Sequence, residues 1–428
     1  MRAPVSTPMH QLARAMRTNS MVKFCEFATE QFSEIHLKEL CVAEVGPNRE
    51  MIVGGKQLIN FGFDSFLGLD QDPRVQEALI LGAQTWGTQF GASRAFASCG
   101  IEVDLERKIA AWMGTEAALI FPSVTLTNVG ALPGLVGPAD VLAVDEFAHN
   151  SIHEGTKIAK ANGVRVLPFS HNSAEALEKT LIDAQPYRSA VIAIDGVYSM
   201  SGAIAAMPEL NDVAKRHNGV LYIDDAHATA VLGKKGRGTV LETLGSYDNT
   251  LTVGCLSKAC SVFGAFIACT SEFQRLLKMR SNTYIFGGPV PPPYLAAISA
   301  VVDILCSDEY DVLRDRLDRN VRQMVDGLTE LDLSVLGGQS PILSVLVGDE
   351  EETFKAGKFL FDRGFYVQSV TFPAVPYHAG ILRIQINANH RPQDIAGLLE
   401  AIGDLRGAIP LPDAAAIQRR VMALASRP

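Results

Sequence analysis

The sequence predicts an α/β protein with a large domain, built on a mostly parallel and doubly wound sheet, and a small α+β domain after it. From about Glu102 onward, short apolar runs of strand length alternate with longer stretches of helical period. Several of these runs are apolar throughout, which is typical of parallel strands that are buried on both faces. Strands that alternate with helices form such sheets with helices on either side. After Leu331, strand-like runs alternate with helices again, in an order different from that of the first part, which indicates the second domain.

Length and composition narrow the class of protein further. The chain has 428 residues, of which 47% are hydrophobic and 20% are charged, as expected for a globular protein of about two or three domains. Its formal net charge of −9 and the lack of basic runs argue against binding to nucleic acid. No apolar run reaches the roughly 18 residues of a membrane span, so we expect no integral membrane segment.

Cysteine usage indicates a reducing compartment. The seven cysteines are odd in number, are scattered, and include no Cys-x-x-Cys pair. This pattern argues against a disulfide framework and against a zinc site, and we predict no metal. The N-terminus shows no apolar core followed by a cleavage site, so we expect a cytoplasmic protein.

The elements can be placed in order along the chain. We expect an N-terminal helical arm over residues 1–55, with one amphipathic helix over Val22–Val42, then a large domain over 56–308 and a small domain over 309–428. The strands expected in the large domain are Ala117–Phe121, Val141–Val144, Val164–Phe169, Ala190–Ile194, Gly219–Ile223, Leu251–Cys255 and Gly264–Thr270. The chain from 272 to 331 reads as helical, with a loop or helix start in the proline-rich segment Pro289–Pro293. The small domain is expected to contain strands Ile342–Val347, Tyr366–Val370 and Leu382–Ile386 and helices Glu352–Arg363 and Gln393–Leu405.

Polar side chains follow five of the expected strands. In doubly wound sheets, ligands lie beyond the carboxyl ends of the strands, so these side chains are candidates for a common site. They include acids, a lysine, two histidines, and hydroxyls that open a helix. The segments are Pro122-Ser123-Val124-Thr125, Asp145 to His149, Asp195-Gly196-Val197-Tyr198-Ser199, Asp224-Asp225-Ala226-His227 and Leu256-Ser257-Lys258.

Together these residue types meet the chemical requirements of pyridoxal phosphate (PLP). A lysine in a cleft of low dielectric can have a lowered pKa and form a Schiff base. An aspartate beside a pyridine nitrogen keeps that nitrogen protonated and makes the ring an electron sink. Backbone N–H groups at a helix N-terminus bind a phosphate.

Each of these residues also has a plain structural interpretation. Lys258 alone would be a solvated surface residue, Asp224 a helix N-cap, and Ser123 and Thr125 capping residues. His149 and His227 singly would be polar packing residues. The ordered combination favours the cofactor interpretation.

Several segments have the form of motifs of one enzyme family. They are His149-Asn150-Ser151, Asp195-Gly196-Val197-Tyr198-Ser199-Met200, Asp224-Asp225-Ala226-His227-Ala228, Leu256-Ser257-Lys258-Ala259 and Leu382-Arg383. Over roughly residues 55–405 the chain resembles the α-oxoamine synthases, which are fold-type I PLP-dependent transferases. The resemblance implies a homodimer that condenses an amino acid with an acyl thioester, on CoA or on acyl carrier protein. The products would be an α-amino ketone, CO2 and a free thiol.

The resemblance also implies roles for individual residues. Lys258 would bind PLP as a Schiff base and move protons at Cα, and Asp224 would pair with the pyridinium nitrogen. His227 and Ser199 would hydrogen-bond the phenolic oxygen of the ring. His149 would stack on the ring and help hold the substrate carboxylate, and the catalytic residues would be His149, Lys258 and Asp224.

For the substrate, Arg383 would bind a carboxylate, although a surface ion pair is the alternative. The segment around Ser65 would touch the amino acid.

The segments that would hold the phosphate depart from the family pattern. The chain has Ser123-Val124-Thr125 in place of Ser-Gly-aromatic, and Cys255 and Gly287 each replace a threonine. Two hydroxyl donors are therefore missing, which predicts weaker binding of PLP. The alternative is that Thr125, Ser257 and backbone N–H groups replace them.

Two other functions remain open on the sequence alone. One is a different PLP reaction on the same scaffold, such as transamination or aldol cleavage. The other is a non-catalytic subunit that regulates a partner synthase. The sequence identifies neither the amino acid nor the acyl chain.

Overall fold

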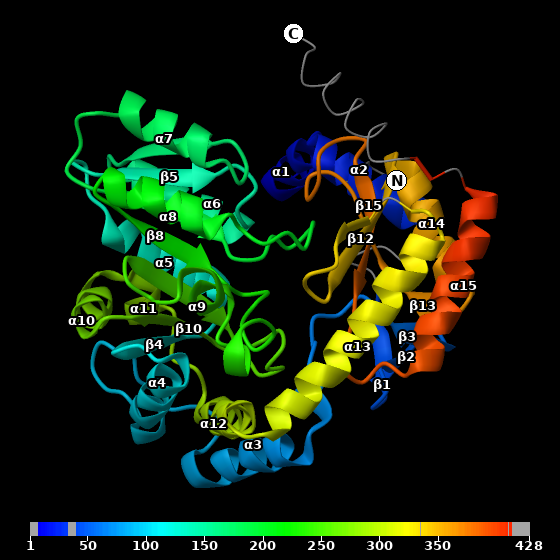
Figure 1. The fold of residues 1–428 in the computed structure, drawn as a ribbon, viewed down its shortest axis with the longest axis horizontal. Helices are drawn as coiled ribbons and strands as arrows, with labels where there is room; N and C mark the ends of the chain where they lie inside the picture. Colours follow the sequence, from blue (N-terminus) through cyan, green and yellow to red (C-terminus); the bar gives the residue numbers. More distant parts are fainter. Residues whose placement is uncertain (1–6, 33–39, 334, 410, 413–428) are drawn as a thin grey trace.

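The computed structural model describes residues 7–32, 40–333, 335–409 and 411–412. The chain forms two lobes (Figure 1). One lobe holds the large sheet and its covering helices, and the other combines the C-terminal domain with strands from the N-terminal part of the chain. Helix α12 (Pro292–Cys306), which begins at the proline-rich segment as expected, and helix α13 (Glu309–Glu330) lead from the first lobe to the second.

The large domain contains a seven-stranded sheet in the order β4-β10-β9-β8-β7-β5-β6. All neighbours are parallel except β10, which is antiparallel to both β4 and β9. The mostly parallel, doubly wound architecture is confirmed, and each predicted strand is present with ends shifted by at most one residue. The strands are β4 (Ala117–Phe121), β5 (Val141–Asp145), β6 (Arg165–Phe169), β7 (Ala190–Asp195), β8 (Gly219–Asp224), β9 (Thr250–Cys255) and β10 (Ala265–Cys269).

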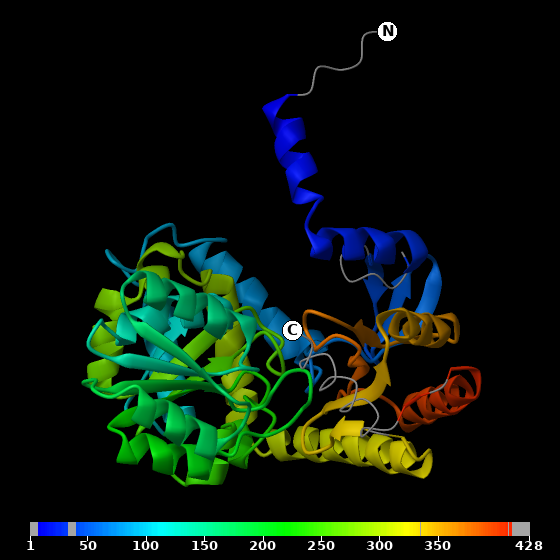
Figure 2. The same cartoon turned by 90° about the horizontal axis from the view of Figure 1, so that it is seen from above.

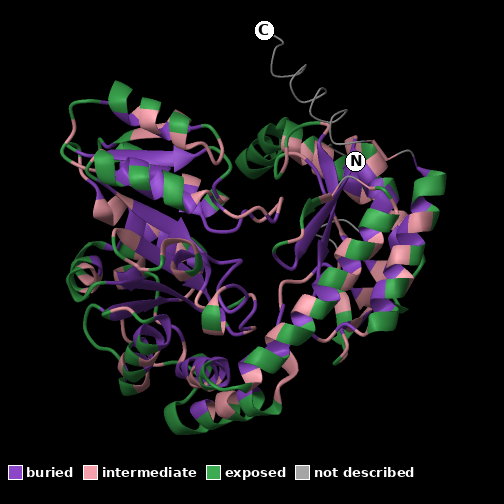
Figure 3. Cartoon of the chain, viewed as in Figure 1, coloured by how far each residue is buried: buried purple, intermediate pink, exposed green. Residues whose placement is uncertain are grey.

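Helices cover both faces of this sheet, which explains why its strands are apolar throughout. In β4, Leu119 and Phe121 pack on one face, and Ala118 and Ile120 pack on the other. Figure 3 shows the strands as almost entirely buried. The first face carries α5 (Val124–Leu135), α6 (Asn150–Ala161), α10 (Ser271–Arg280) and α11 (Asn282–Phe286). The second carries α12, α4 (Gly100–Met113), α7 (Ala174–Asp183), α8 (Met207–Arg216) and α9 (Thr239–Leu244).

The small domain has the predicted mixture of strands and helices. Its antiparallel sheet has the order β11-β12-β15-β14. The strands are β11 (Val335–Gly337), β12 (Ile342–Gly348), β14 (Gln368–Val370) and β15 (Gly380–Gln385). Besides α13, its helices are α14 (Glu350–Asp362) and α15 (Pro392–Ala408).

Among the described residues of the N-terminal part of the chain, helices come first and strands follow. Helices α1 (Pro8–Met16) and α2 (Ser20–Phe32) are followed, after residues 33–39 that lie outside the description, by strands β1 (Val42–Val45), β2 (Glu50–Val53) and β3 (Lys56–Asn60). The predictions of a helical arm over 1–55 and of a single helix reaching Val42 are therefore wrong for these strands. Figure 2 shows α1 extending away from the rest of the molecule.

A tight turn and a distant partner strand explain this difference. The turn between β2 and β3 is Gly54-Gly55, with φ of 56° and 80°, the positive values that a two-residue hairpin of type I′ requires. Strand β3 also pairs in parallel with β13 (Phe365–Tyr366), so the N-terminal strands join a sheet that the small domain completes.

The remaining elements are the helix α3 (Pro73–Trp86), which packs on α12, and the short turns η1 (Leu69–Gln71) and η2 (Lys234–Gly236). None of the helices in the described part of the chain combines the length and the apolar character that crossing a bilayer requires.

Candidate active site

Asp224 is the last residue of β8 and lies buried at the carboxyl edge of the large sheet, by which we mean the ends of β4, β5, β7, β8 and β9. Its Oδ2 accepts a hydrogen bond of 2.7 Å from Asn128 Nδ2, and its Oδ1 accepts one of 3.2 Å from the Ala226 backbone N–H. Two donors therefore fix this carboxylate from the protein side. Asp195, the last residue of β7, pairs with it in register, which places a second carboxyl group at the same edge.

His149 caps the N-terminus of α6 at the same edge. Its backbone N–H donates to Asp195 Oδ1 at 2.9 Å, and its Nδ1 accepts from the Ser151 backbone N–H at 3.2 Å. The Ser151 hydroxyl lies 2.7 Å from the same Nδ1. Burial lowers the pKa of His149, although the charge of Asp224 opposes this shift. These contacts assign an acceptor role to Nδ1, so the single ring proton of the neutral imidazole lies on Nε2.

Lys258 lies three residues after the end of β9, and neighbouring charged groups shift its pKa. Burial lowers its pKa, but neighbouring acidic groups, with Asp224 and Asp64 among them, outweigh burial, so the pKa lies above the ordinary value for lysine. The expectation of a lowered lysine pKa is therefore wrong. The physical reason is that acidic groups surround this amine, and these groups stabilise its charged form.

His227 supplies the clearest indication that the site receives a ligand. Its ring is buried, and its Nδ1 has no hydrogen-bond partner among the described residues. Burial lowers the pKa of His227 far below its ordinary value, and the charges of Lys258 and Arg383 lower it further, so the ring is neutral. A buried polar atom without a partner is costly unless a ligand or water pairs with it.

These residues fit PLP. The phenolic oxygen of the ring would be a partner for His227 Nδ1, Asp224 would face the pyridine nitrogen, and Lys258 would reach the aldehyde carbon. Ser199, the second predicted partner of the phenolic oxygen, is half-buried, and its backbone carbonyl accepts from Arg383 Nε at 2.7 Å.

The residues predicted for the phosphate lie near the N-terminus of α5 and the end of β9. Ser123 caps α5, because its Oγ accepts from the Leu126 backbone N–H at 3.2 Å, while Val124 is buried and Thr125 is exposed. Cys255 is buried, and its Sγ lies 3.2 Å from the hydroxyl of the exposed Ser257. The capping interpretation thus holds for Ser123, and the hydroxyls of Thr125 and Ser257 are accessible to a ligand.

The predicted substrate residues come from the small domain and from the chain after β3. Arg383 in β15 is buried and donates to Ser199 O at 2.7 Å, to Gln368 Oε1 at 2.9 Å and to Asp64 Oδ1 at 3.4 Å. The guanidinium has five N–H donors, so donors remain for a carboxylate ligand. The backbone carbonyl of Ser65 accepts from Asn387 Nδ2 and from the Gly68 N–H, which fixes this segment beside β15.

Sequence reasoning missed three residues that shape this site: Asn128, Asp64 and Gln368. Asn128 lies four residues after Val124, so helical spacing places both on one face of α5 and could have indicated it. Asp64 lay in a segment that was singled out, but its ion pair with Arg383 depends on the contact between two distant parts of the chain. Nothing in the local sequence indicates Gln368.

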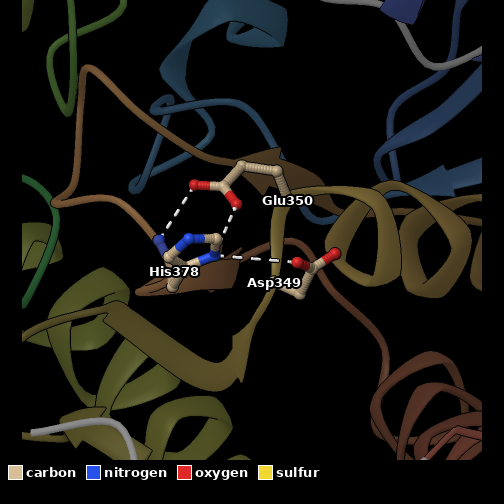
Figure 4. A group of neighbouring side chains, drawn as sticks. All are labelled: Asp349, Glu350 and His378. Atoms are coloured by element: carbon tan, nitrogen blue, oxygen red, sulfur yellow. Dashed lines mark hydrogen bonds and ion pairs between the residues drawn. The ribbon is translucent and has the colours of Figure 1, made fainter. Parts of the chain in front are cut away.

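A second cluster of polar residues lies away from the site, at the start of α14 (Figure 4). His378 Nδ1 lies 3.2 Å from Glu350 Oε2 and 3.7 Å from Asp349 Oδ2, and among the described residues this is the one group with the proximity of metal ligands. Asp349 Oδ1 caps α14 by accepting from the Glu351 N–H at 3.0 Å. Because the positive end of a helix disfavours a cation, the geometry fits a helix cap that His378 extends.

The chain is similar to a family of known proteins and to individual members of it. The family model described as aminotransferase class I and II matches residues 56–402. The 8-amino-7-oxononanoate synthase of Geobacter sulfurreducens is 34% identical over 353 residues, which are 82% of this chain and 90% of that protein. The serine palmitoyltransferase of Bacteriovorax stolpii is 30% identical over 363 residues, covering 84% and 85%. The solved structure of serine palmitoyltransferase from S. paucimobilis with bound PLP and myriocin superposes with a TM-score of 0.85 at 25% identity, covering 92% of this chain and 98% of that one.

Proposed function

Because the chain belongs to the aminotransferase class I and II family, and its relatives there are α-oxoamine synthases, we propose that it condenses an amino acid with an acyl thioester in a PLP-dependent reaction. The products are an α-amino ketone, CO2 and a free thiol. The donor is an acyl-CoA or an acyl carrier protein.

The observation that best supports this proposal is that the buried Nδ1 of His227, on which the charge of Lys258 acts, has no partner among the described residues. When bound, PLP supplies a pyridinium ring that withdraws electrons from Cα of the amino acid. Asp224 holds the proton on the pyridine nitrogen, and His227 and Ser199 bind the phenolic oxygen.

Lys258 transfers the protons at Cα of the amino acid. Its Nζ removes the proton from Cα and later returns one. His149 carries its proton on Nε2, so it can donate a hydrogen bond on the substrate side while Ser151 occupies Nδ1.

Arg383 orients the amino acid by its carboxylate. Three of its N–H groups are already engaged by protein oxygens, which fixes the guanidinium before the substrate binds. A fixed donor loses less conformational entropy on binding than a free side chain.

The proposal is tested by measuring thiol and CO2 release with a panel of amino acids and acyl-CoA donors. We expect equal amounts of both products, dependent on the amino acid and the acyl donor together, and none from the Lys258→Ala variant. Amino-group transfer or aldehyde formation without thiol release would instead indicate transamination or aldol cleavage. A wild-type protein inert with every pair would indicate a non-catalytic subunit.

We also propose that the protein is a homodimer. The rings of Phe96 and Phe286 are 90% and 81% exposed, and Ser93 Oγ donates to Ile285 O at 2.6 Å, which joins the two segments that carry them. A second copy of the chain would cover these rings. In sedimentation analysis, Phe286→Asp should convert a dimer to a monomer, whereas a monomeric wild-type protein would contradict the proposal.

A cytoplasmic location is proposed from the cysteines. All seven are unpaired, and four of them are buried: Cys99, Cys255, Cys260 and Cys269. Unpaired thiols are typical of a reducing compartment.

A further inference from the structure

The side chain of Asn128 makes three hydrogen bonds in the interior of the large domain. It is fully buried on α5, and its Nδ2 donates to Asp224 Oδ2 at 2.7 Å and to Ser151 Oγ at 2.8 Å. Its Oδ1 accepts from the Tyr222 hydroxyl at 2.8 Å. One amide thus contacts both the carboxylate that ends β8 and the serine that contacts His149.

Tyr222 determines which way this amide faces. The phenol is buried, and burial together with the charge of Asp224 raises its pKa well above the ordinary value. It is therefore a protonated donor and requires an acceptor, which among the described residues is the amide oxygen alone. The two N–H groups of Asn128 must then point to Asp224 and Ser151, both of which offer oxygen acceptors.

The hydrogen bond from Asn128 to Ser151 leads on to His149. Because Ser151 Oγ accepts from Asn128, its own proton is available for His149 Nδ1, which lies 2.7 Å away. The chain of bonds therefore runs from Tyr222 through Asn128 and divides, with one branch to Asp224 and the other through Ser151 to His149.

We propose that Asn128 is a positioning residue that fixes the Asp224 carboxylate and the His149 ring relative to one another. The inference rests on the proposed function, in which Asp224 pairs with the ring nitrogen of the cofactor and His149 stacks on the face of the same ring. Asn128 itself touches neither cofactor nor substrate in this account, and its effect passes through these two side chains.

The test compares two buried asparagines that receive the same change. Asn128→Asp places a second carboxylate beside Asp224, where like charges compete for one proton. Asn211→Asp is the matched control, because Asn211 on α8 is also buried but pairs with Asn249 Nδ2 at 3.1 Å, away from the site. Far-UV circular dichroism and thermal denaturation verify that each variant is folded.

We expect the PLP dissociation constant of Asn128→Asp to rise at least about tenfold, against a change within about twofold for Asn211→Asp. The 15N chemical shift of ring-labelled PLP should also differ from that of wild type in Asn128→Asp only. If the two folded variants bind PLP equally well and give the same 15N shift, the positioning role is contradicted.

The variant Ser151→Ala tests the branch to His149 separately from the branch to Asp224. It also tests the proposal if Asn128→Asp fails to fold. It removes the hydroxyl contact with His149 but keeps the bond from the backbone N–H of residue 151 to His149 Nδ1 and the bond from Asn128 to Asp224. We expect PLP affinity within about twofold of wild type and a dissociation constant for the amino acid raised several-fold. Unchanged amino-acid binding would contradict the branch to His149. A wild-type protein that binds no PLP would instead contradict the proposed function, so the two failures can be told apart.

Discussion

The carboxylate of Asp224 is fixed by Asn128 and by the Ala226 N–H before any ligand is present. A pyridinium nitrogen that approaches it meets an acceptor that needs little reorganisation. This arrangement stabilises charge at little cost when the reaction begins.

Asp224→Asn tests the charge of this side chain while keeping its shape. A neutral amide cannot hold the pyridinium proton, so we expect kcat to fall by at least about 100-fold while some PLP is still bound. Steady-state kinetics and absorbance titration with PLP measure both quantities. Turnover within a few-fold of wild type would show that Asp224 is not the partner of the ring nitrogen.

Asp64 forms an ion pair with Arg383, the residue proposed to bind the substrate carboxylate. Its carboxylate lies 3.4 Å from Arg383 Nη2, where it competes with the carboxylate of an amino acid. Asp64→Asn removes the competing charge, so we expect KM for the amino acid to fall several-fold with little change in kcat. A higher KM would mean that Asp64 contributes to substrate binding instead.

At the scale of elements, the N-terminus of α5 and the end of β9 form the predicted phosphate site. The hydroxyl of Thr125 is exposed there, whereas Cys255 presents a buried thiol. A thiol is a weaker donor than a hydroxyl. Cys255→Thr should therefore tighten PLP binding by about 1 kcal/mol, as measured by the dissociation constant.

Thr125→Ala is the companion variant for this site. If Cys255→Thr is neutral and Thr125→Ala weakens PLP binding, the phosphate site has been rebuilt around other donors, and the interpretation of a weakened site is wrong.

Buried His390 joins the end of β15 to the N-terminal strands. Its Nδ1 accepts from the Asn387 N–H at 3.0 Å, its Nε2 lies 2.9 Å from Asn60 O, and its ring stacks on Phe61 with centroids 4.0 Å apart. Burial lowers its pKa to about 3. The ring stays neutral in the folded chain. Its contacts therefore stabilise the fold fully at pH values above about 6.5, the ordinary pKa of histidine.

As the pH falls from about 6.5 towards 3, the unfolded chain takes up a proton that the folded chain does not, so stability is lost. Over this range the free energy of unfolding falls by up to about 1.4 kcal/mol per pH unit. Denaturant unfolding at several pH values should show a shallower loss for His390→Gln than for wild type. Equal slopes for the two proteins would contradict a depressed pKa at His390.

At the scale of the whole molecule, the sequence predicted the large sheet well because strands buried on both faces are apolar throughout. The N-terminal strands were missed because their sheet is completed by β13, about 300 residues away along the chain. The Gly54-Gly55 turn was the local signal for them. The raised pKa of Lys258 was missed because it depends on the convergence of charges from separate segments, including Asp64.

The residues at the carboxyl edge of the large sheet are proposed to hold PLP on Lys258. Reduction of the PLP-loaded protein with borohydride, followed by peptide mapping, tests this attachment. We expect one pyridoxyl group per chain, on the peptide that contains Lys258 and at its Nζ, and no stable label in Lys258→Ala. A label on another lysine, or none in a protein saturated with PLP, would contradict the assignment of Lys258.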